Sequence, residues 1–333
     1  ILVSLAVGWL LSFKKPKSYV FYAVEGYICV SLCWVVLSLF GALPFWISGE
    51  IPSFVDALFE TISGFTTTGA SILNNVEGLS HGCLFWRSFT HWIGGMGVLV
   101  FILAVFPMRG GNSMFLMKAE SPGPSVEKLV PRVKTTAFIL YAVYTVMTIL
   151  EIILLFATGM PFFDAVTLSL GTAGTGGFGI KNDSIASYAP HLQVIITVFM
   201  ILFGVNFNAY YLMLRKKFKT AFTEEVKVYL GIILVSGLAI AWNIRHIFPD
   251  PLEALRHAFF QVGSVITTTG YSTADFDLWP AFSTTILVTI MFIGACAGST
   301  GGGIKVSRVV ILIKSMIREQ KFLYQWKSCS TGH

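Results

Sequence analysis

The chain has 333 residues, of which 55% are hydrophobic and only 12% are charged, and its mean hydropathy is +0.74. A soluble domain usually carries about 25% charged residues. The composition therefore excludes an ordinary soluble protein and indicates a chain that crosses the membrane several times. The net charge of +6 at pH 7 would suit a nucleic-acid partner, but the distribution of the charges argues against one.

Most of the basic residues gather in four groups along the chain. They lie within residues 14–17, 109–134, 215–227 and 305–327. All four groups fall on one side of the membrane if successive spans alternate in direction, and this positive-inside pattern places that side in the cytoplasm. We therefore predict a multi-pass protein of the cell (inner or plasma) membrane that contacts the lipid bilayer, has cytoplasmic basic loops and binds no nucleic acid.

Six apolar segments are long enough to cross a membrane as a helix, which takes about 20 residues. They are residues 26–49, 88–108, 135–158, 184–214, 228–244 and 278–304, and Glu151 is the one charged residue within them. Residues 1–13 are apolar but too short, and we interpret them as part of a further span before a cytoplasmic turn. The five cysteines have neither metal-ligand spacing nor the pattern of a disulfide framework.

Three short apolar stretches, at residues 54–65, 162–171 and 252–265, cannot cross the membrane, and each leads toward a turn rich in Thr and Gly. The turns are Thr66, Thr67, Thr68 and Gly69; Gly174, Thr175, Gly176 and Gly177; and Thr267, Thr268, Thr269 and Gly270. Each last glycine follows an alanine (Ala57, Ala165 or Ala258) by twelve residues. The three units are therefore repeats in register.

These repeats predict an all-α polytopic membrane protein with pseudo-symmetric span–pore-loop–span repeats around a central ion pore. The predicted segments are a partial span and turn at 1–17, pore repeats at 18–110, 135–214 and 227–320, cytoplasmic linkers at 111–134 and 215–226, and an atypical tail at 321–333.

The Thr/Gly turns suit a cation pore, because irregular backbone at membrane depth must be buried in protein or line water. Glycine lets backbone carbonyls turn toward a common axis, and rings of carbonyls replace the hydration shell of potassium. None of the turns contains a carboxylate, which argues against a calcium site. We predict potassium as the transported substrate, with no cofactor and no enzymatic activity.

The last apolar segment is interrupted by ten consecutive small residues. They are Gly294, Ala295, Cys296, Ala297, Gly298, Ser299, Thr300, Gly301, Gly302 and Gly303, and Lys305 follows shortly after them. Each interior Gly costs about 1 kcal/mol relative to Ala in a helix. The run predicts a helix that opens into a loop lining a cavity, although a Gly-rich helix-packing face is an alternative.

Several of these motifs resemble one transporter family. Residues 59–71 (FETISGFTTTGAS) resemble the first pore loop of the TrkH branch of the Trk/Ktr potassium transporters. Residues 91–97 (HWIGGMG) resemble its next span, and residues 255–270 resemble its third pore loop. The resemblance implies one filter glycine per repeat, here Gly69, Gly177 and Gly270, and a gating role for the loop that ends near Lys305. It also implies a homodimer and a cytoplasmic nucleotide-binding regulatory subunit (TrkA-like).

The resemblance further implies a fourth pore repeat, which this chain does not contain. We expect the chain to be a fragment, a frameshift product or a truncated gene model. Alone, it is expected not to conduct selectively.

The same Thr/Gly loops would also suit a secondary transporter of another cation, sodium or ammonium, and this is the alternative function. An organic-substrate transporter would need inverted repeats, and an intramembrane enzyme would need a nucleophile–base or metal constellation.

Among the polar residues near or within the membrane, we single out Glu25, Glu60, Glu151 and His91 as functional candidates. Glu60 would either brace the filter by bonding to backbone, or face the interface or simply pair with another residue. Arg87, Arg245 and His257 are predicted to be interface residues.

Overall fold

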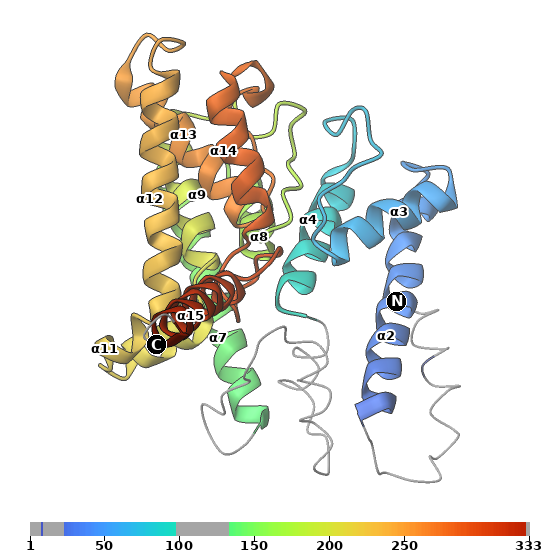
Figure 1. Cartoon of the computed structure of the whole chain (residues 1–333). Helices are drawn as coiled ribbons and strands as arrows, with labels where there is room; N and C mark the ends of the chain where they lie inside the picture. Colours follow the sequence, from blue (N-terminus) through green and yellow to red (C-terminus); the bar gives the residue numbers. More distant parts are fainter. Residues whose placement is uncertain (1–7, 9–22, 98–132, 331–333) are drawn as a thin grey trace. The chain divides into compact units, whose positions relative to one another are not determined.

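The computed structural model describes residue 8, residues 23–97 and residues 133–330 (Figure 1). Within these ranges the chain is helical and has no β-strand beyond one isolated bridge between Ile293 and Ile304. The predicted all-α class is confirmed. Apart from residue 8, the predicted segment 1–17 lies outside the described residues, as do most of the linker 111–134 and the end of the tail 321–333.

The chain divides into two compact units, and α7 (Val133–Ala157) runs from the first into the second. The first unit comprises Ile1–Leu150 and Phe162–Asn182, and the second comprises Glu151–Pro161 and Asp183–His333.

The first unit holds the first pore repeat and the short helix of the second. Its helices are α2 (Ala23–Ile47), α3 (Phe54–Phe65), α4 (His81–Met96), the first part of α7, and α8 (Phe162–Gly174). The short helix α3 packs against both α2 and α4, and α4 also packs against α8. Two short helices that precede Thr/Gly turns therefore contact the same span.

Local sequence sets both ends of α3. The Ser53 hydroxyl accepts a hydrogen bond from the Asp56 N–H at 3.4 Å, and the Asp56 carboxylate lies in the first turn, where a helix favours negative charge. At the other end, Thr67 has a φ of 53°, which a helix cannot accommodate. The helix has the bounds predicted from the sequence, whereas α8 extends beyond its predicted end at residue 171.

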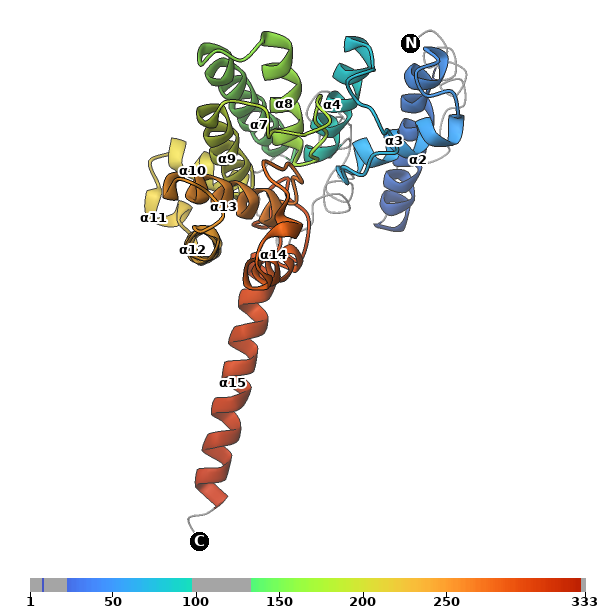
Figure 2. The ribbon, with the colours of Figure 1, turned by 90° about the horizontal axis from the view of Figure 1, so that it is seen from above.

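The second unit holds the third pore repeat. Its helices after the end of α7 are α9 (Pro190–Phe203), α10 (Phe207–Leu214), α11 (Phe218–Ala221), α12 (Glu224–Ile244), α13 (Pro251–Ile266), η1 (Phe276–Leu278), α14 (Ala281–Phe292) and α15 (Val306–Ser330). Figure 2 shows α15 as one long helix that extends away from α14. The short helix α13 packs against α9, α12 and α14.

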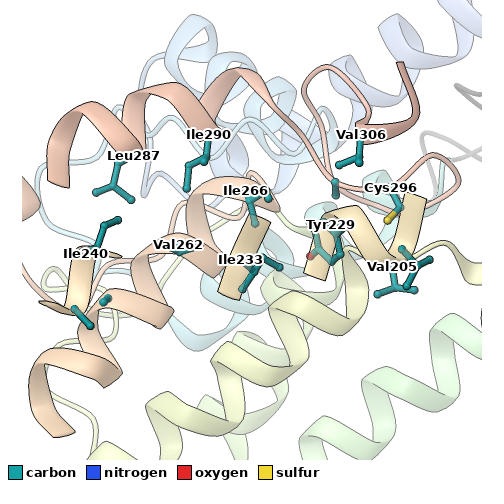
Figure 3. Packing of buried hydrophobic residues seen from close by; sticks show 14 of the residues in the cluster. Val205, Tyr229, Ile233, Ile240, Val262, Ile266, Leu287, Ile290, Cys296 and Val306 are labelled. Atoms are coloured by element: carbon teal, nitrogen blue, oxygen red, sulfur yellow. The ribbon is translucent and has the colours of Figure 1, made fainter. Parts of the chain in front are cut away.

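A hydrophobic core holds α13 in place (Figure 3). Ile240 of α12, Val262 of α13, and Leu287 and Ile290 of α14 are all buried in it. Because a fully buried aliphatic side chain contributes about 1.5–3 kcal/mol, this core fixes the position from which the third Thr/Gly turn begins.

Three of the described helices are long and apolar enough to cross a membrane, over residues 27–47, 137–157 and 224–244. The pair α9 and α10 would make a fourth span, although the two helices are bent by 91°. The helix of the second predicted span, α4, is described to Met96, and α14 has 12 residues before the chain leaves the helix.

The apolar segment 184–214, which we predicted to cross the membrane as a helix, contains two helices instead of one. The helix breaks at Gly204, and the Asn206 side chain accepts a hydrogen bond from the Asn208 N–H at 2.9 Å to start α10. A Cβ built on Gly204 would overlap the Tyr229 hydroxyl oxygen. Glycine at the break thus lets the chain pass close to α12.

Two glycines let α4 approach its neighbours within the first unit. A Cβ built on Gly94 would overlap the carbonyl oxygen of Phe65, at the end of α3, and one built on Gly95 would lie 2.6 Å from the Cα of Gly174. Membrane helices use small residues in this way to bring backbones together. The two contacts place α4 directly against the ends of both short helices.

Gly94→Ala is expected to lower the free energy of unfolding by about 1–3 kcal/mol, as overpacking usually does, because the Phe65 carbonyl cannot move without α3. Thermal unfolding of the purified protein in detergent measures the effect. The control is Gly82→Ala in the same helix, where an added Cβ meets only the Ser80 hydroxyl oxygen at 3.8 Å. Equal melting temperatures for the two variants would contradict this packing.

Candidate functional site

The three Thr/Gly turns share one unusual backbone conformation. Thr67, Thr175 and Thr268 have φ values of 53°, 53° and 58°, and they are three of the five non-glycine residues with positive φ in the described part of the chain. The glycine two positions later is also left-handed in each turn, with φ of 75° at Gly69, 80° at Gly177 and 84° at Gly270. A β-branched residue in this region is a genuine outlier, and such strain is typical of functional sites.

Each turn is also anchored by the same hydrogen bonds to the helix before it. The second residue donates its N–H to the carbonyl three residues back: Thr67 to Gly64 (3.1 Å), Thr175 to Thr172 (3.0 Å) and Thr268 to Val265 (3.0 Å). The third residue donates to the carbonyl five residues back: Thr68 to Ser63 (2.9 Å), Gly176 to Gly171 (3.1 Å) and Thr269 to Ser264 (2.8 Å). The repeat alignment inferred from spacing therefore corresponds to one recurring backbone structure.

The threonine hydroxyls of the first and third turns brace the backbone. The hydroxyl of Thr66 donates to the Ile62 carbonyl at 2.7 Å and lies 2.8 Å from the Thr68 hydroxyl. The equivalent hydroxyl of Thr267 donates to the Gly263 carbonyl at 2.6 Å and lies 2.7 Å from that of Thr269. The first threonine of each turn thus ties the turn to the end of its helix.

The second turn has glycine where the other two have these threonines, and α4 explains the difference. A Cβ built on Gly176 would overlap the ring of His91, and one built on Gly174 would overlap the His91 carbonyl. The His91 ring is fully buried and stacks on Phe178 with a centroid distance of 4.1 Å. Packing of His91 therefore occupies the space that two threonine side chains would need. Gly174, the first residue of the second turn, is also the last residue of α8.

The first and second turns touch each other within the first unit. A Cβ built on Gly69 would overlap the carbonyl oxygen of Gly176. Two sequence segments more than 100 residues apart therefore bring their Gly-containing backbones into contact, with no room for a side chain between them.

Glu60 braces the segment that follows the first turn. It lies on α3 with 1% of its surface exposed. Its carboxylate accepts hydrogen bonds from the Ser71 hydroxyl at 3.0 and 3.2 Å and from the Ile72 N–H at 3.1 Å. Of the roles considered for Glu60, interfacial exposure is therefore excluded.

Arg87 of α4 is the partner of Glu60. Its Nε lies 2.5 Å from Glu60 Oε1, and both side chains are buried, with 4% and 0% exposed. Arg87 also donates to the Gly179 carbonyl at 2.8 Å, and its guanidinium lies 3.6 Å from the ring centroid of Phe178. The prediction of an interface residue is wrong here, because Glu60 and Gly179 hold the guanidinium in the interior. The pair links the segments that follow the first and second turns.

The third repeat braces its turn by other means. Ser264 on α13 donates its hydroxyl to the Tyr271 carbonyl at 2.6 Å. His257, which we predicted to be an interface residue, is only 6% exposed, and its Nδ1 lies 2.8 Å from the Thr273 hydroxyl. Arg245, by contrast, lies over the ring of Trp242 at 3.8 Å. In the third repeat, a serine hydroxyl and a histidine ring therefore stabilise the segment after the turn, which the Glu60–Arg87 ion pair does in the first repeat.

The small residues 294–303 break the last span as expected. The chain leaves α14 at Ile293 and enters α15 at Val306, and the loop closes on itself through a bond from the Gly294 N–H to the Ile304 carbonyl at 2.8 Å. Lys305 is buried and donates to the Gly301 carbonyl. The Gly302 N–H donates to the Thr268 hydroxyl at 2.7 Å. The loop therefore contacts the third turn directly.

The model of the TrkH family, described as cation transport protein, matches residues 1–325 of the chain. The chain belongs to this family. TrkH-family proteins are transporters rather than enzymes, so the resemblance found in the motifs and the expectation of a non-enzyme are both confirmed.

Individual TrkH proteins are similar in sequence to most of this chain. The Trk system potassium uptake protein TrkH of Salmonella typhimurium is 37% identical over 331 residues, which cover 96% of this chain and 68% of the relative. The TrkH protein of Halomonas elongata is 35% identical, with 89% of this chain and 62% of that protein covered. The chain thus spans about two thirds of the length of these relatives.

The fold agrees as well. The crystal structure of the potassium transporter TrkH from Vibrio parahaemolyticus matches with a TM-score of 0.79 and 31% identity, over 93% of this chain and 65% of that one. The predicted membrane-transporter fold is therefore confirmed.

Sequence reasoning missed three features of this TrkH-family chain: the burial of Arg87, the break at Gly204, and Glu225, whose carboxylate accepts hydrogen bonds from the Ala297 and Ser307 N–H groups. Arg87 is the one Lys, Arg, Asp or Glu residue of α4, and Glu60 lies within the neighbouring short helix α3, so the two opposite charges are expected to pair. Of the other polar candidates, Glu151 is fully buried in α7, and the side chain of Glu25 lies outside the described part.

Breaking the ion pair is expected to be costly, because the remaining charge stays buried. Glu60→Gln and Arg87→Gln should each lower the free energy of unfolding by about 3–5 kcal/mol. The double variant should lose clearly less than the sum of the two. Unfolding of all four proteins in detergent gives this double-mutant cycle.

The exposed pair between Lys314 and Glu224, with 60% of each side chain exposed, is the control. Lys314→Gln should leave stability unchanged. Strictly additive effects of the Glu60 and Arg87 substitutions would contradict a direct pair.

Proposed function

We propose that the chain forms the ion-translocating part of a potassium-uptake protein and that its three turns supply carbonyl oxygens to the selectivity filter. The filter residues are Thr66, Thr67, Thr68 and Gly69; Gly174, Thr175, Gly176 and Gly177; and Thr267, Thr268, Thr269 and Gly270. The observation that carries the proposal is the recurrence of one left-handed threonine and one left-handed glycine at the same positions in each turn.

The chemistry of the turns favours a monovalent cation. Each turn follows the C-terminal end of a short helix, which carries partial negative charge. The oxygens on offer are backbone carbonyls and hydroxyls, the ligands that replace water around potassium. Ionised oxygens, which calcium prefers, are absent from the turns themselves. The relatives carry the words potassium uptake in their names.

The intramembrane loop formed by residues 294–303, with Lys305, is the proposed gate. Its backbone contacts the third turn through the bond between Gly302 and Thr268. A loop bonded to the turn by one hydroxyl can leave it without unfolding a helix, and irregular backbone at this depth is tolerated where it lines a cavity.

We further infer the setting of the protein. The relatives belong to a Trk system, and this name supports a further Trk component of the TrkA kind as partner. That this partner is a cytoplasmic nucleotide-binding regulatory subunit, and that the protein is a homodimer in the lipid bilayer, is what the family resemblance implies. The basic groups at 14–17, 109–134, 215–227 and 305–327 would face the cytoplasm of the cell (inner or plasma) membrane. The proposed repeats remain residues 18–110, 135–214 and 227–320.

Gly69→Ser is expected to reduce the preference for potassium over sodium by about tenfold or more, which corresponds to ~1.4 kcal/mol. The added Cβ would force apart the backbones of Gly69 and Gly176 and strain the left-handed φ of 75°. Rubidium flux against sodium, measured in liposomes with the protein from its complete gene, gives the ratio.

Gly49→Ser is the matched control. Gly49 has a φ of 76°, but nothing lies within 4 Å of an added Cβ, and it lies in the loop before α3. Its substitution carries the same backbone strain without touching a turn, so the flux ratio should not change. An unchanged ratio for Gly69→Ser, or a protein that prefers sodium or ammonium from the start, would overturn the potassium assignment.

A further inference from the structure

One carboxylate holds the intramembrane loop at two points. Glu225 lies in the first turn of α12, and its Oε1 accepts the Ala297 N–H at 2.7 Å and the Ser307 N–H at 3.2 Å. Ala297 precedes the glycine-rich part of the loop, and Ser307 follows it at the start of α15. One carboxylate oxygen therefore accepts a hydrogen bond on each side of the glycine-rich part of the loop.

The same carboxylate suits its position electrostatically. The N–H groups in the first turn of a helix have no partner within the helix, and the N-terminus of a helix favours negative charge. Glu225 supplies that charge to α15 through Ser307. Bonds to an ionised acceptor are roughly twice as strong as neutral ones, so this contact outweighs any single neutral bond of the loop.

The break between α9 and α10 binds the loop from the other side. The Cys296 N–H donates to the Gly204 carbonyl at 3.0 Å, and the Phe207 N–H donates to the Gly298 carbonyl at 3.0 Å. The Thr300 hydroxyl also donates to the Phe203 carbonyl at 3.3 Å. Each of the two broken helices thus satisfies backbone groups that the other leaves unpaired.

These contacts bury a cysteine that reports on the loop. Cys296 is 0% exposed and lies beside Val205 and Tyr229 (Figure 3). Its thiol cannot react with a reagent in solution while the loop stays docked on the α9–α10 break and on α12.

We propose that Glu225 is the positioning residue that holds the intramembrane loop against the α9–α10 break. The consequence for transport rests on the proposed function, since it assumes that the loop is the gate. The role of Glu225 in positioning the loop does not depend on that assumption. Loss of the Glu225 carboxylate frees Ala297 and Ser307 together, and the glycine-rich segment between them then departs from the third turn.

Thiol labelling of the full protein in detergent tests this. Maleimide modification of each cysteine is followed over time by mass spectrometry, in the unsubstituted protein, in Glu225→Gln and in Glu224→Gln. Glu225→Gln should raise the labelling rate of Cys296 by about tenfold, because an amide oxygen accepts the Ala297 and Ser307 N–H bonds more weakly than a carboxylate does. Glu224→Gln, one residue away, should not, because Glu224 binds only the exposed Lys314 among its described contacts.

Cys83 is the internal reference, because it is buried at 6% exposure and belongs to the first unit, whereas the loop belongs to the second. An unchanged Cys296 rate in Glu225→Gln would overturn the proposal, and so would an equal rise at Cys83 and Cys296, because it would show general unfolding. Labelling requires no ion flux. A failure here therefore leaves the filter assignment intact, and a failed flux experiment leaves the labelling result intact.

Discussion

Every backbone N–H and C=O at membrane depth needs a hydrogen-bond partner, because lipid offers none. A helix meets this need internally, whereas the described part of this chain leaves the helix three times at Thr/Gly turns and twice more within apolar segments, at Gly204 and after Phe292. The turns return their N–H groups to the end of the preceding helix through the same pair of bonds each time. The two broken spans instead use each other, with Cys296 bonded to Gly204 and Phe207 bonded to Gly298. Irregular backbone survives in this chain where another irregular segment or a helix end lies against it.

Buried charges serve the same requirement. Glu60 and Arg87 form an ion pair, and each also bonds to neighbouring segments: Glu60 to the Ser71 hydroxyl and the Ile72 N–H, and Arg87 to the Gly179 carbonyl. Glu225 gives one oxygen to two backbone N–H groups. A buried charge without such partners would be strongly destabilising. Glu60, Arg87 and Glu225 therefore stabilise loops, so that a few charged residues hold several loops of this apolar chain in fixed conformations.

Much of this structure could be predicted from spacing alone. The shared twelve-residue interval placed the three turns in register. The structure shows that residues at corresponding positions have the same backbone conformation, with φ of 53–58° at threonine and 75–84° at glycine. The run of small residues likewise predicted the break between Phe292 and Val306. What could not be predicted depends on tertiary contacts. The glycines of the second turn exist because His91 fills the space beside them, and the 91° bend at Gly204 depends on its contacts with Tyr229 and the loop. A local sequence pattern does not predict which side chain of another helix packs against it.

The central claim is that the carbonyls of the left-handed turns bind the transported ion. Thallium is a potassium substitute that scatters strongly, so crystals of the complete gene product grown in thallium salts, with and without excess potassium, test it most directly. We expect anomalous density within coordination distance of the carbonyl oxygens around Gly69, Gly177 and Gly270, and its loss when potassium competes. Thallium bound only elsewhere, or density at the turns that excess potassium does not displace, would contradict the account.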